Sequence, residues 1–251
     1  MSLKNFPVLR TKRLTVQLKE LSIGESIAIA SMPIHLHEAI TTTFLRAAAS
    51  SVKGEQDPSQ WTVQERIFAV CHYLACVIEG GPDFQLGANG KYSDYLDGTA
   101  DISGSVQSVP VGEIGGDAWN VRHLTGGMAE SIERLSGVID GIGGRMHWIL
   151  GPMAAQLVRD GEETPLPEGG EGEFDDWLAA RMKVMAAFPS SDFELLVYAF
   201  GDGREKLHHL FRLNCDEDGL LAMPKEGAAA GLPPARFPVR SGLAGIVFQL
   251  V

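Results

Sequence analysis

The chain has 251 residues, 45% of them apolar, which is enough to bury a core in one large domain or two smaller ones. Its formal net charge is -11 and no basic cluster exceeds the one at Arg10–Arg13, so the composition argues against a nucleic-acid groove. Three cysteines at irregular spacing favour a reducing compartment over a disulfide framework.

No segment has the pattern of a membrane-directed element. Residues 1–14 lack the apolar core of a secretion signal. No window reaches the roughly 18 uninterrupted apolar residues that suggest a transmembrane helix. We therefore expect no membrane insertion, and a protein that stays in the cytoplasm or leaves it without a secretion signal.

The first third of the chain predicts one strand followed by helices. Residues 12–18 alternate between apolar and polar side chains, as a half-buried strand does. Two capping boxes, Ser22 with Glu25 and Thr62 with Glu65, mark where helices begin. Helices are expected over residues 22–31, 34–49 and 63–79, with Pro33 separating the first two.

Two cysteines and a histidine fall within the third of these helices, in WTVQERIFAVCHYLACV, residues 61–77. Cys71 belongs to the apolar stripe and lies about 140° around the helix from Cys76, so the two thiols do not face each other. Cys215 has no CxxC or HxxxH companion, so the paired spacings of a zinc site are missing. We predict that the cysteines pack as small apolar side chains and that the protein uses no metal or cofactor.

A long segment that is rich in Gly, Asp and Ser follows, over residues 80–116. Its few regular periods predict a loop, and a loop of this length is usually functional or bound to a partner. Phe84, Tyr92 and Tyr95 lie in it. These aromatic side chains either anchor an interface with another chain or pin the loop to its own core, and both interpretations stay open.

The middle of the chain predicts buried helices and then an exposed linker. Residues 118–125 and 128–139 look helical. The segment GRMHWILGPMAAQLVRDG, which contains Trp148, is apolar nearly all round and predicts a helix that is buried or packed against a neighbouring chain. GEETPLPEGGEGE, residues 161–173, is acidic and rich in Gly and Pro, so we interpret it as an exposed linker and a candidate domain boundary.

The C-terminal part predicts two helices, a strand pair and an apolar tail. A helix is expected from residue 173, and a capping box of Ser191 and Glu194 is expected to begin another that stops at Gly201. The tail ends in an apolar run that we expect to be a strand or a docking segment covered by this chain or by a partner. The strands are expected over residues 208–213 and 220–223, with an Asp218-Gly219 turn between them.

These patterns predict an α+β fold, predominantly helical, with a small antiparallel β part near the C-terminus. Three regions are expected. They are an N-terminal strand with helices over residues 1–80, a long loop with buried helices over 81–160, and a C-terminal α+β region over 173–251.

Motifs for catalysis or ion binding are weak. Asn214, Asp216, Asp218 and Gly219 match the start of a calcium loop, but Lys225 stands where the loop needs a bidentate Glu. A weak ion site near Asp216 and Asp218 stays open. No phosphate-binding loop, nucleophile elbow or HExxH motif occurs, and nothing in the spacing of the 32 acidic residues selects a catalytic pair.

The N-terminal third is similar to virion proteins of bacteriophages with contractile tails. LTVQLKELSIGESIAIASMPIHLHEAITTTFLRAAAS and DPSQWTVQERIFAVCHYLA resemble baseplate hub and tail-assembly proteins encoded near the tape-measure gene. The resemblance covers roughly residues 12–79, with a weaker echo in YSDYLDG and HLFRLNCDEDGLLAMP. It implies a structural or assembly role in the virion tail, with host cytoplasm as the site of assembly and other tail proteins, in several copies, as partners.

We therefore expect a structural component of a phage baseplate that acts through protein–protein contacts and is not an enzyme. Two alternatives are a tail-assembly chaperone that leaves before maturation and a tail-associated cell-wall hydrolase, which needs a cleft with carboxylates of unequal pKa. The residues expected at interfaces are Phe84, Tyr92, Tyr95, Trp148, Phe237, Val247 and Phe248.

Overall fold

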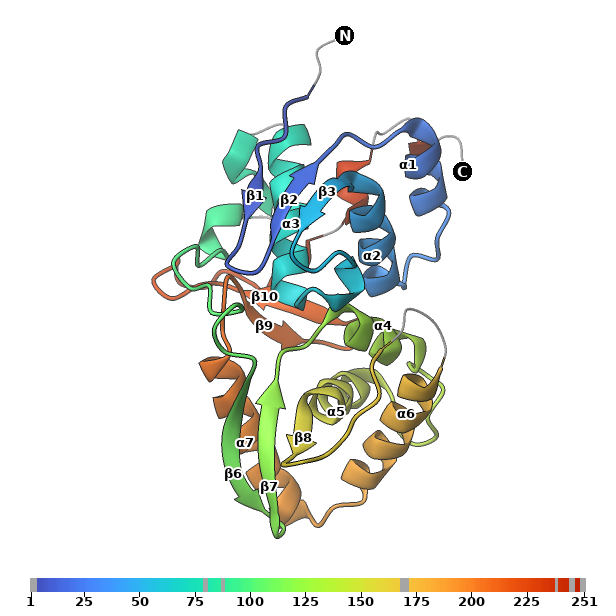
Figure 1. Cartoon of the computed structure of the whole chain (residues 1–251), viewed down its shortest axis with the longest axis vertical. Helices are drawn as coiled ribbons and strands as arrows, with labels where there is room; N and C mark the ends of the chain where they lie inside the picture. The colour runs from blue at the N-terminus through green and yellow to red at the C-terminus, as the bar shows by residue number, and fades with distance from the viewer. Residues whose placement is uncertain are drawn as a thin grey trace.

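The computed structural model describes residues 4–78, 81–86, 89–167, 172–237, 239–243 and 247–248 of the chain. The described residues hold seven α-helices and four small antiparallel sheets, 44% helical and 19% strand. Figure 1 shows an upper half, near which both ends of the chain lie, stacked on a lower half built from the middle of the chain. The mixed α+β class is confirmed, but the expected confinement of β structure near the C-terminus is wrong, because strands occur in both halves.

The upper half combines two small antiparallel sheets, of three and two strands, with three helices. Both predicted capping boxes are formed, by Ser22 with Glu25 and by Thr62 with Glu65, and the chain turns at Pro33 between the first two helices, as expected. The elements are β1 (Leu9–Arg10), β2 (Thr15–Leu18), α1 (Ile23–Ala30), α2 (His37–Ala48), β3 (Ala49–Lys53), α3 (Val63–Val77), β4 (Gln85–Leu86) and β5 (Gly90–Lys91).

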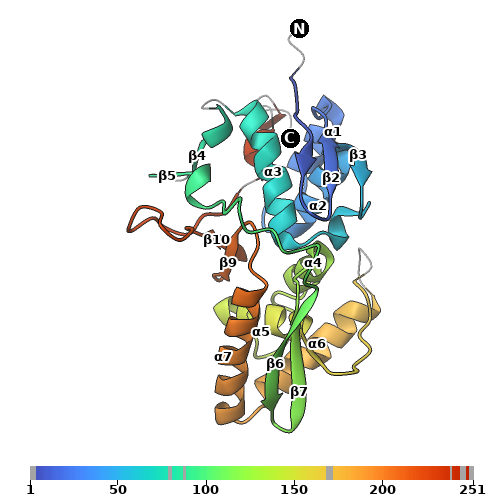
Figure 2. The ribbon, with the colours of Figure 1, turned by 60° about the vertical axis from the view of Figure 1, so that its left-hand side comes forward.

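The lower half packs four helices around a second antiparallel sheet of three strands. Its elements are β6 (Ser108–Ile114), β7 (Asp117–Arg122), α4 (Gly126–Arg134), α5 (Gly144–Gln156), β8 (Leu157–Arg159), α6 (Glu173–Ala186) and α7 (Ser190–Lys206). Figure 2 shows α7 standing beside the hairpin of β6 and β7.

The β6–β7 hairpin stands where the sequence predicts a helix over residues 118–125, so that prediction is wrong. Gly115 and Gly116 have positive φ angles of 64° and 86°, which suit the tight turn of a hairpin. Trp119 and Val121 are buried two residues apart, and two is the period of a strand. The turn glycines and this period favour the hairpin over the helix.

Two further predictions in the middle of the chain need correction. The segment 80–116, expected to be an irregular loop, contains β4, β5 and β6. The helix expected over residues 128–139 is α4, which starts earlier and ends at Arg134, ahead of Gly137 with its φ of 76°. The all-round apolar helix is confirmed as α5, most of whose residues are buried.

α7 differs from its prediction at both ends. Its N-cap is Pro189 and makes no side-chain hydrogen bond, so the predicted capping box of Ser191 and Glu194 does not form. The helix also continues past Gly201 to Lys206, because tertiary packing supports its last turns. A Cβ atom added to Gly203 would lie 2.7 Å from Cγ2 of Val121, so this glycine lets α7 approach the sheet closely.

A second hairpin lies where the two halves meet. β9 (Arg212–Cys215) and β10 (Leu220–Met223) pair antiparallel, and Gly219 in the turn has a φ of 135°, which confirms the predicted strand pair. The first strand begins at Arg212 and not at residue 208, because Leu210 has a φ of 56°, a left-handed conformation that interrupts the extended backbone.

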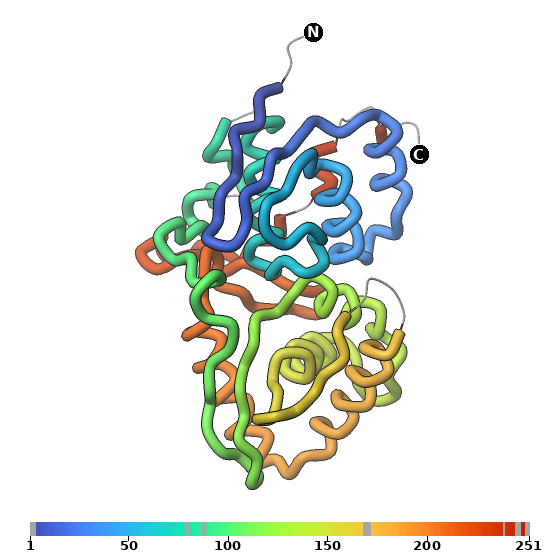
Figure 3. Tube along the Cα trace, in the orientation of Figure 1, coloured from blue at the N-terminus to red at the C-terminus, as the bar shows by residue number. Residues whose placement is uncertain are grey.

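After β10 the chain returns to the upper half, as the trace in Figure 3 shows. The short 3-10 helix η4 (Val239–Gly242) lies against α3 there. Most of the apolar run that was expected to form a strand or docking segment lies outside the described residues, at 244–246 and 249–251.

Buried apolar side chains form two clusters that follow the two halves. The upper cluster joins residues from 6–95 with residues from 210–247, so both ends of the chain contribute to one core. The lower cluster is drawn mainly from residues 119–207, with Val63 of α3 as its only buried member from the N-terminal part described here. The division into three regions stays a prediction.

Candidate interaction surface and central cleft

The structure places the predicted interface residues at different depths. Phe237 is half-buried, and Phe248 alone is well exposed, at 48%. The buried ones are Phe84, Tyr92, Tyr95, Trp148 and Val247.

The aromatic residues of segment 81–97 pack against the chain's own C-terminal part. Phe84 and Tyr92 stack with ring centroids 5.3 Å apart, and Tyr95 meets Phe237 edge-on at 6.0 Å. The Tyr95 hydroxyl donates a hydrogen bond to the carbonyl of Pro233 at 2.8 Å. Of the two interpretations of these aromatics, the contacts correspond to the one in which they pin the segment to its own core.

Several exposed apolar side chains lie on α6, on α7 and in the turn between them. We call these residues the α6–α7 corner: Val184, Phe188, Leu195, Val197 and Tyr198. Leu195 is 57% exposed, Tyr198 68% and Val184 54%, while Phe188 is partly buried. α7 buries only Leu196, Phe200 and Gly203. Where exposed apolar side chains form a contiguous patch, that patch is typical of a contact with another molecule.

A hollow of about 220 Å³ opens beside the corner. The guanidinium carbon of Arg181 lies 5.0 Å from the ring centroid of Trp177 and 5.5 Å from that of Trp119, and Arg159 covers Trp119 at 5.2 Å. Arg181 also pairs with Glu162, so its charge is neutralised within the chain. The lining of the hollow is therefore mainly apolar, and the charges of its two arginines are neutralised by Asp117 and Glu162.

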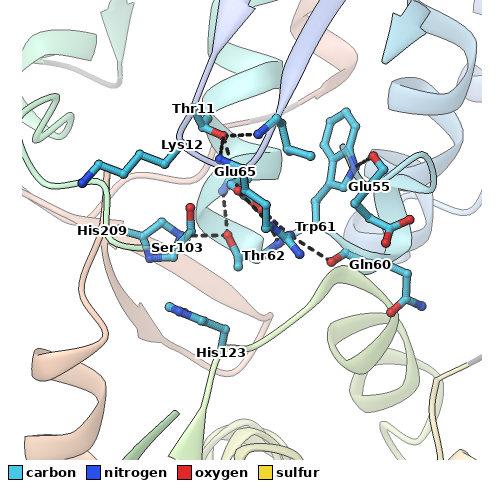
Figure 4. A network of polar contacts seen from close by, with 12 residues as sticks. Thr11, Lys12, Glu55, Gln60, Trp61, Thr62, Glu65, Ser103, His123 and His209 are labelled. Atoms are coloured by element: carbon cyan, nitrogen blue, oxygen red, sulfur yellow. Dashed lines mark hydrogen bonds and ion pairs between the residues drawn. The ribbon is translucent and has the colours of Figure 1, made fainter. Parts of the chain in front are cut away.

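Between the halves, the first turn of α3 carries a network of polar side chains, one side of which is drawn in Figure 4. Arg13 donates to both carboxylate oxygens of Glu65, at 2.6 and 3.3 Å, and Glu65 also accepts from the backbone of Thr62. Backbone hydrogen bonds join the halves at the same place, from Val63 to the carbonyl of Leu124 at 2.9 Å and from Gly126 to that of Trp61 at 2.9 Å.

His209 closes this side of the network. Its Nδ1 lies 3.1 Å from the carbonyl of Leu207, which can only accept, so Nδ1 carries the proton. Nε2 of the neutral ring then accepts from the Thr62 hydroxyl at 2.8 Å. Burial, together with the nearby His123, lowers the pKa of His209 from 6.5 to about 4. The Thr62 hydroxyl and the His209 imidazole therefore hydrogen-bond to each other, and this bond has a structural role.

The other side of the network is a buried cluster of one cation and several carboxyl groups. Arg66 is 1% exposed and lies 3.2 Å from a carboxylate oxygen of Glu38. It donates to the Glu38 carbonyl at 2.6 Å and to the Thr42 hydroxyl at 2.9 Å, and that hydroxyl donates to Glu130. Burial raises the pKa of Glu38, because the desolvation exceeds the attraction of Arg66.

Glu133, on α4 in the lower half, caps a helix of the upper half. The N-cap residue of α2, Leu36, makes no side-chain hydrogen bond. The two oxygens of Glu133 accept instead from the backbone N–H groups of Glu38 at 2.9 Å and Ala39 at 3.2 Å. Burial and then the neighbouring Glu38 raise the pKa of Glu133 from 4.5 to about 7. The Glu133 carboxyl group therefore links the two halves by capping α2, and its negative charge is costly because the group is buried.

A cleft of about 310 Å³ adjoins this cluster, and we call it the central cleft. Apolar side chains from α3, α5 and β10 line it, among them Trp148, and Phe237 lies at its edge from the C-terminal segment. His37 also lines it, and burial followed by Arg236 lowers the pKa of this histidine. Carboxyl groups beside an apolar cleft are a possible acid–base pair, yet Glu38 and Glu133 are already engaged with Arg66 and with α2.

The possible ion site lies at the turn between β9 and β10. Asp216 accepts from Arg236 at 2.6 Å and from the backbone of Asp218 at 2.9 Å. Across the described ranges, no three His, Cys, Asp or Glu side chains gather as metal ligands would. Cys71 is buried and Cys76 and Cys215 are partly buried, and all three are free thiols. None of the helices in the described part of the chain is long and apolar enough to span a bilayer.

Sequence reasoning did not identify the corner or the Arg66 cluster. The corner has a local signal in FELLVYAF, residues 193–200, where seven of eight residues are apolar, more than one buried face of a helix requires. The cluster has no local signal, because its members come from α2, α3 and α4. Searches against protein-family profiles, curated proteins and solved structures find no match to this chain.

Proposed function

We propose that the protein is a structural component of a bacteriophage contractile-tail baseplate, at the hub or tail tip, and acts through protein–protein contacts. In this proposal it is present in several copies in the virion, is assembled in the host cytoplasm and catalyses no reaction. Its support is the resemblance of residues 12–79 to such proteins and the exposed α6–α7 corner.

The exposed corner is the observation that carries the proposal. Leu195 and Tyr198 are three residues apart on α7, so they project from the same face of the helix. Burying one large apolar side chain stabilises a complex by about 2 kcal/mol, which is a useful contribution to an interface. The corner lies at the end of the lower half away from the central cleft, so a subunit docked there leaves the core of the chain undisturbed (Figure 1).

Quantitative mass spectrometry of purified phage particles tests this function. We expect the chain among the structural proteins at more than one copy per particle. Leu195→Glu and Tyr198→Glu should each reduce its incorporation about tenfold or more, because each buries a charge in the contact. Val138→Glu is the matched control, since Val138 is 65% exposed outside the corner. Equal incorporation of all three variants would show that the corner makes no contact.

The same experiment separates the first alternative, an assembly chaperone. A chaperone is absent from mature particles and present in complexes isolated during assembly. Its contacts would use the same corner, so the corner variants would then block assembly and leave no trace in the particle itself.

A cell-wall hydrolase is the second alternative, and the raised pKa values of Glu38 and Glu133 beside the central cleft are the observation that favours it. Release of soluble peptidoglycan by the purified chain, abolished in Glu38→Gln or Glu133→Gln variants that remain folded, would support it. If the wild-type chain releases no peptidoglycan, the hydrolase alternative is excluded. Their existing bonds to Arg66 and α2 make these carboxyl groups less available for proton transfer.

A further inference from the structure

The central cleft has the size and the lining of a small-molecule site. Its volume of about 310 Å³ lies at the lower end of the range for ligand pockets, which is roughly 300 to 1,000 Å³. The apolar part of its lining includes Ile40, Ile67, Val70, Trp148 and Leu220. A lining of this kind accommodates the apolar body of a ligand, because the ligand leaves water when it binds.

The acidic side chains of the lining are Glu38, Glu133 and Asp218. Glu38 pairs with Arg66 at 3.2 Å, and Glu133 accepts from two backbone N–H groups of α2. Burial raises the pKa of both carboxyl groups, which favours their uncharged forms. Asp218 is exposed at the turn between β9 and β10, so water and salt screen its charge. The two glutamates of the lining are therefore engaged within the chain.

The basic side chains of the lining are Arg66, Arg236 and Arg240. The terminal nitrogens of Arg66 pair with Glu38 and Glu130, and Arg236 pairs with Asp216 at 2.6 Å. Two of the three cations in the lining are therefore neutralised by carboxylates of the chain itself.

Arg240 is the third cation, and it forms no ion pair with any residue that the structure describes. It donates to the carbonyl of Met32, but its Nε is buried and has no hydrogen-bond partner among the described residues. Nε of Arg66 also lacks a partner there. Burial and then Arg236 lower the pKa of His37 in the same cleft, an effect that Asp218 opposes and Arg240 strengthens. Buried donors without an acceptor are rare in folded proteins and often mark a site for another molecule.

We propose that the central cleft binds a small amphipathic anion, whose apolar body lies against the lining and whose carboxylate pairs with Arg240. A carboxylate supplies both the negative charge and the acceptor that Arg240 lacks, and such charge-assisted hydrogen bonds are stronger than neutral ones. An alcohol of the same length fills the same apolar space but leaves the charge of Arg240 without a counter-charge. The inference goes beyond the proposed structural role and does not depend on it.

Isothermal titration calorimetry of the purified full chain tests the inference with two probes of equal chain length, decanoate and decanol. At neutral pH, decanoate should bind about tenfold more tightly than decanol or better, because only its carboxylate pairs with Arg240. Equal affinities for the two probes, tighter binding of decanol, or no binding of decanoate would overturn the inference.

Substitutions at Arg240 then locate the carboxylate. Arg240→Gln should weaken decanoate binding about tenfold or more and leave decanol binding unchanged, whereas Arg240→Lys should keep the preference for decanoate because it keeps the charge. Arg10→Gln, an exposed substitution on β1, is the matched control and should change neither affinity. If Arg240→Gln leaves decanoate binding unchanged or weakens both probes equally, Arg240 does not bind the carboxylate and the inference fails.

A larger side chain in the lining locates the apolar body. Ala222 lines the cleft and is 1% exposed, so Ala222→Leu adds carbon atoms where the ligand would lie. This variant should weaken the binding of decanoate and decanol alike, and circular dichroism checks that it is folded. Unchanged binding of both probes to the folded variant would overturn the inference. If the variant does not fold, the comparison of the two probes on Arg240→Gln decides.

Discussion

At the scale of single residues, Arg66 holds the join between the halves together. It forms ion pairs with Glu38 and Glu130, and it is almost wholly buried. Breaking a buried ion pair from one side is costly, because the remaining charges have neither water nor a partner.

Arg66→Met should therefore lower the free energy of unfolding by about 3 to 5 kcal/mol. Urea denaturation followed by circular dichroism measures the loss. Arg46→Met is the control, because Arg46 pairs with Asp57 where the two side chains are 50% and 42% exposed. Its loss should stay within about 1 kcal/mol. Similar losses for both variants would contradict the role given to the cluster.

Glu133 should make stability fall as pH rises. Its pKa is raised in the folded state from 4.5 to about 7, so its contribution is fully present below pH 4.5 and is lost as the pH rises through 7. The stability of the wild type relative to Glu133→Gln should drop by at most about 3 kcal/mol over this window and then stay level. Urea titrations across the window measure it, with exposed Glu113→Gln as control. A difference that is flat for Glu133→Gln would refute the assignment.

His209 should act in the opposite direction. Its pKa is lowered in the folded state from 6.5 to about 4, so the neutral ring contributes stability above pH 6.5 that is lost as the pH falls towards 4. Thermal unfolding of the wild type and His209→Gln should diverge least at the acidic end of this range. The exposed His35→Gln should behave as the wild type does. A constant gap between wild type and His209→Gln would count against the buried Thr62–His209 bond.

The sequence predicted only part of the candidate sites at this scale. The sequence singled out Phe84, Tyr92 and Tyr95 but did not decide what they anchor. Phe237, which contacts Tyr92 and Tyr95, is remote in the chain. Arg66 and its carboxylates remained hidden for the same reason. A charge becomes unusual only through its burial, and burial depends on the packing of elements that are distant in sequence.

At the scale of elements, α7 shows how one helix serves both the core and the surface. Gly203 faces the sheet, where an added Cβ would lie 2.7 Å from Val121 and 2.8 Å from Val111, while Gly201 faces open space. Two glycines two residues apart on one helix therefore have opposite roles.

Gly201→Ala should stabilise the protein by about 0.5 to 1 kcal/mol, since alanine favours the helix and meets no neighbour. Gly203→Ala should destabilise it by about 1 to 3 kcal/mol, because the methyl group forces α7 away from the sheet. Differential scanning calorimetry distinguishes the two. Stabilisation by both substitutions would show that α7 does not approach the sheet as closely as described.

The elements with strong local signals were predicted well from the sequence. α1 and α3 have complete capping boxes, and α2 follows the turn at Pro33. The sequence did not predict the β6–β7 hairpin. The Gly115-Gly116 turn indicates a hairpin only together with the alternating burial of Trp119 and Val121 that follows it. The predicted end of α7 at Gly201 is wrong, because a glycine inside a helix is tolerated where later residues such as Gly203 pack against the sheet.

At the scale of the whole molecule, the chain makes one core from its two ends and another from its middle. The first turn of α3 joins the two cores through hydrogen bonds and buried charges, and these contacts hold the two halves together. Four of the chain's well-exposed large apolar side chains, Val184, Leu195, Val197 and Tyr198, lie on α6 and α7. In the proposed function, these are the side chains that a neighbouring subunit covers.

A cryo-EM reconstruction of the intact tail tests this account most directly. We predict that the chain is found in several copies, with Leu195 and Tyr198 covered by a different subunit and with the Arg66 cluster intact inside each copy. A particle that lacks the chain, or one in which every copy leaves the α6–α7 corner open to solvent, would contradict the account.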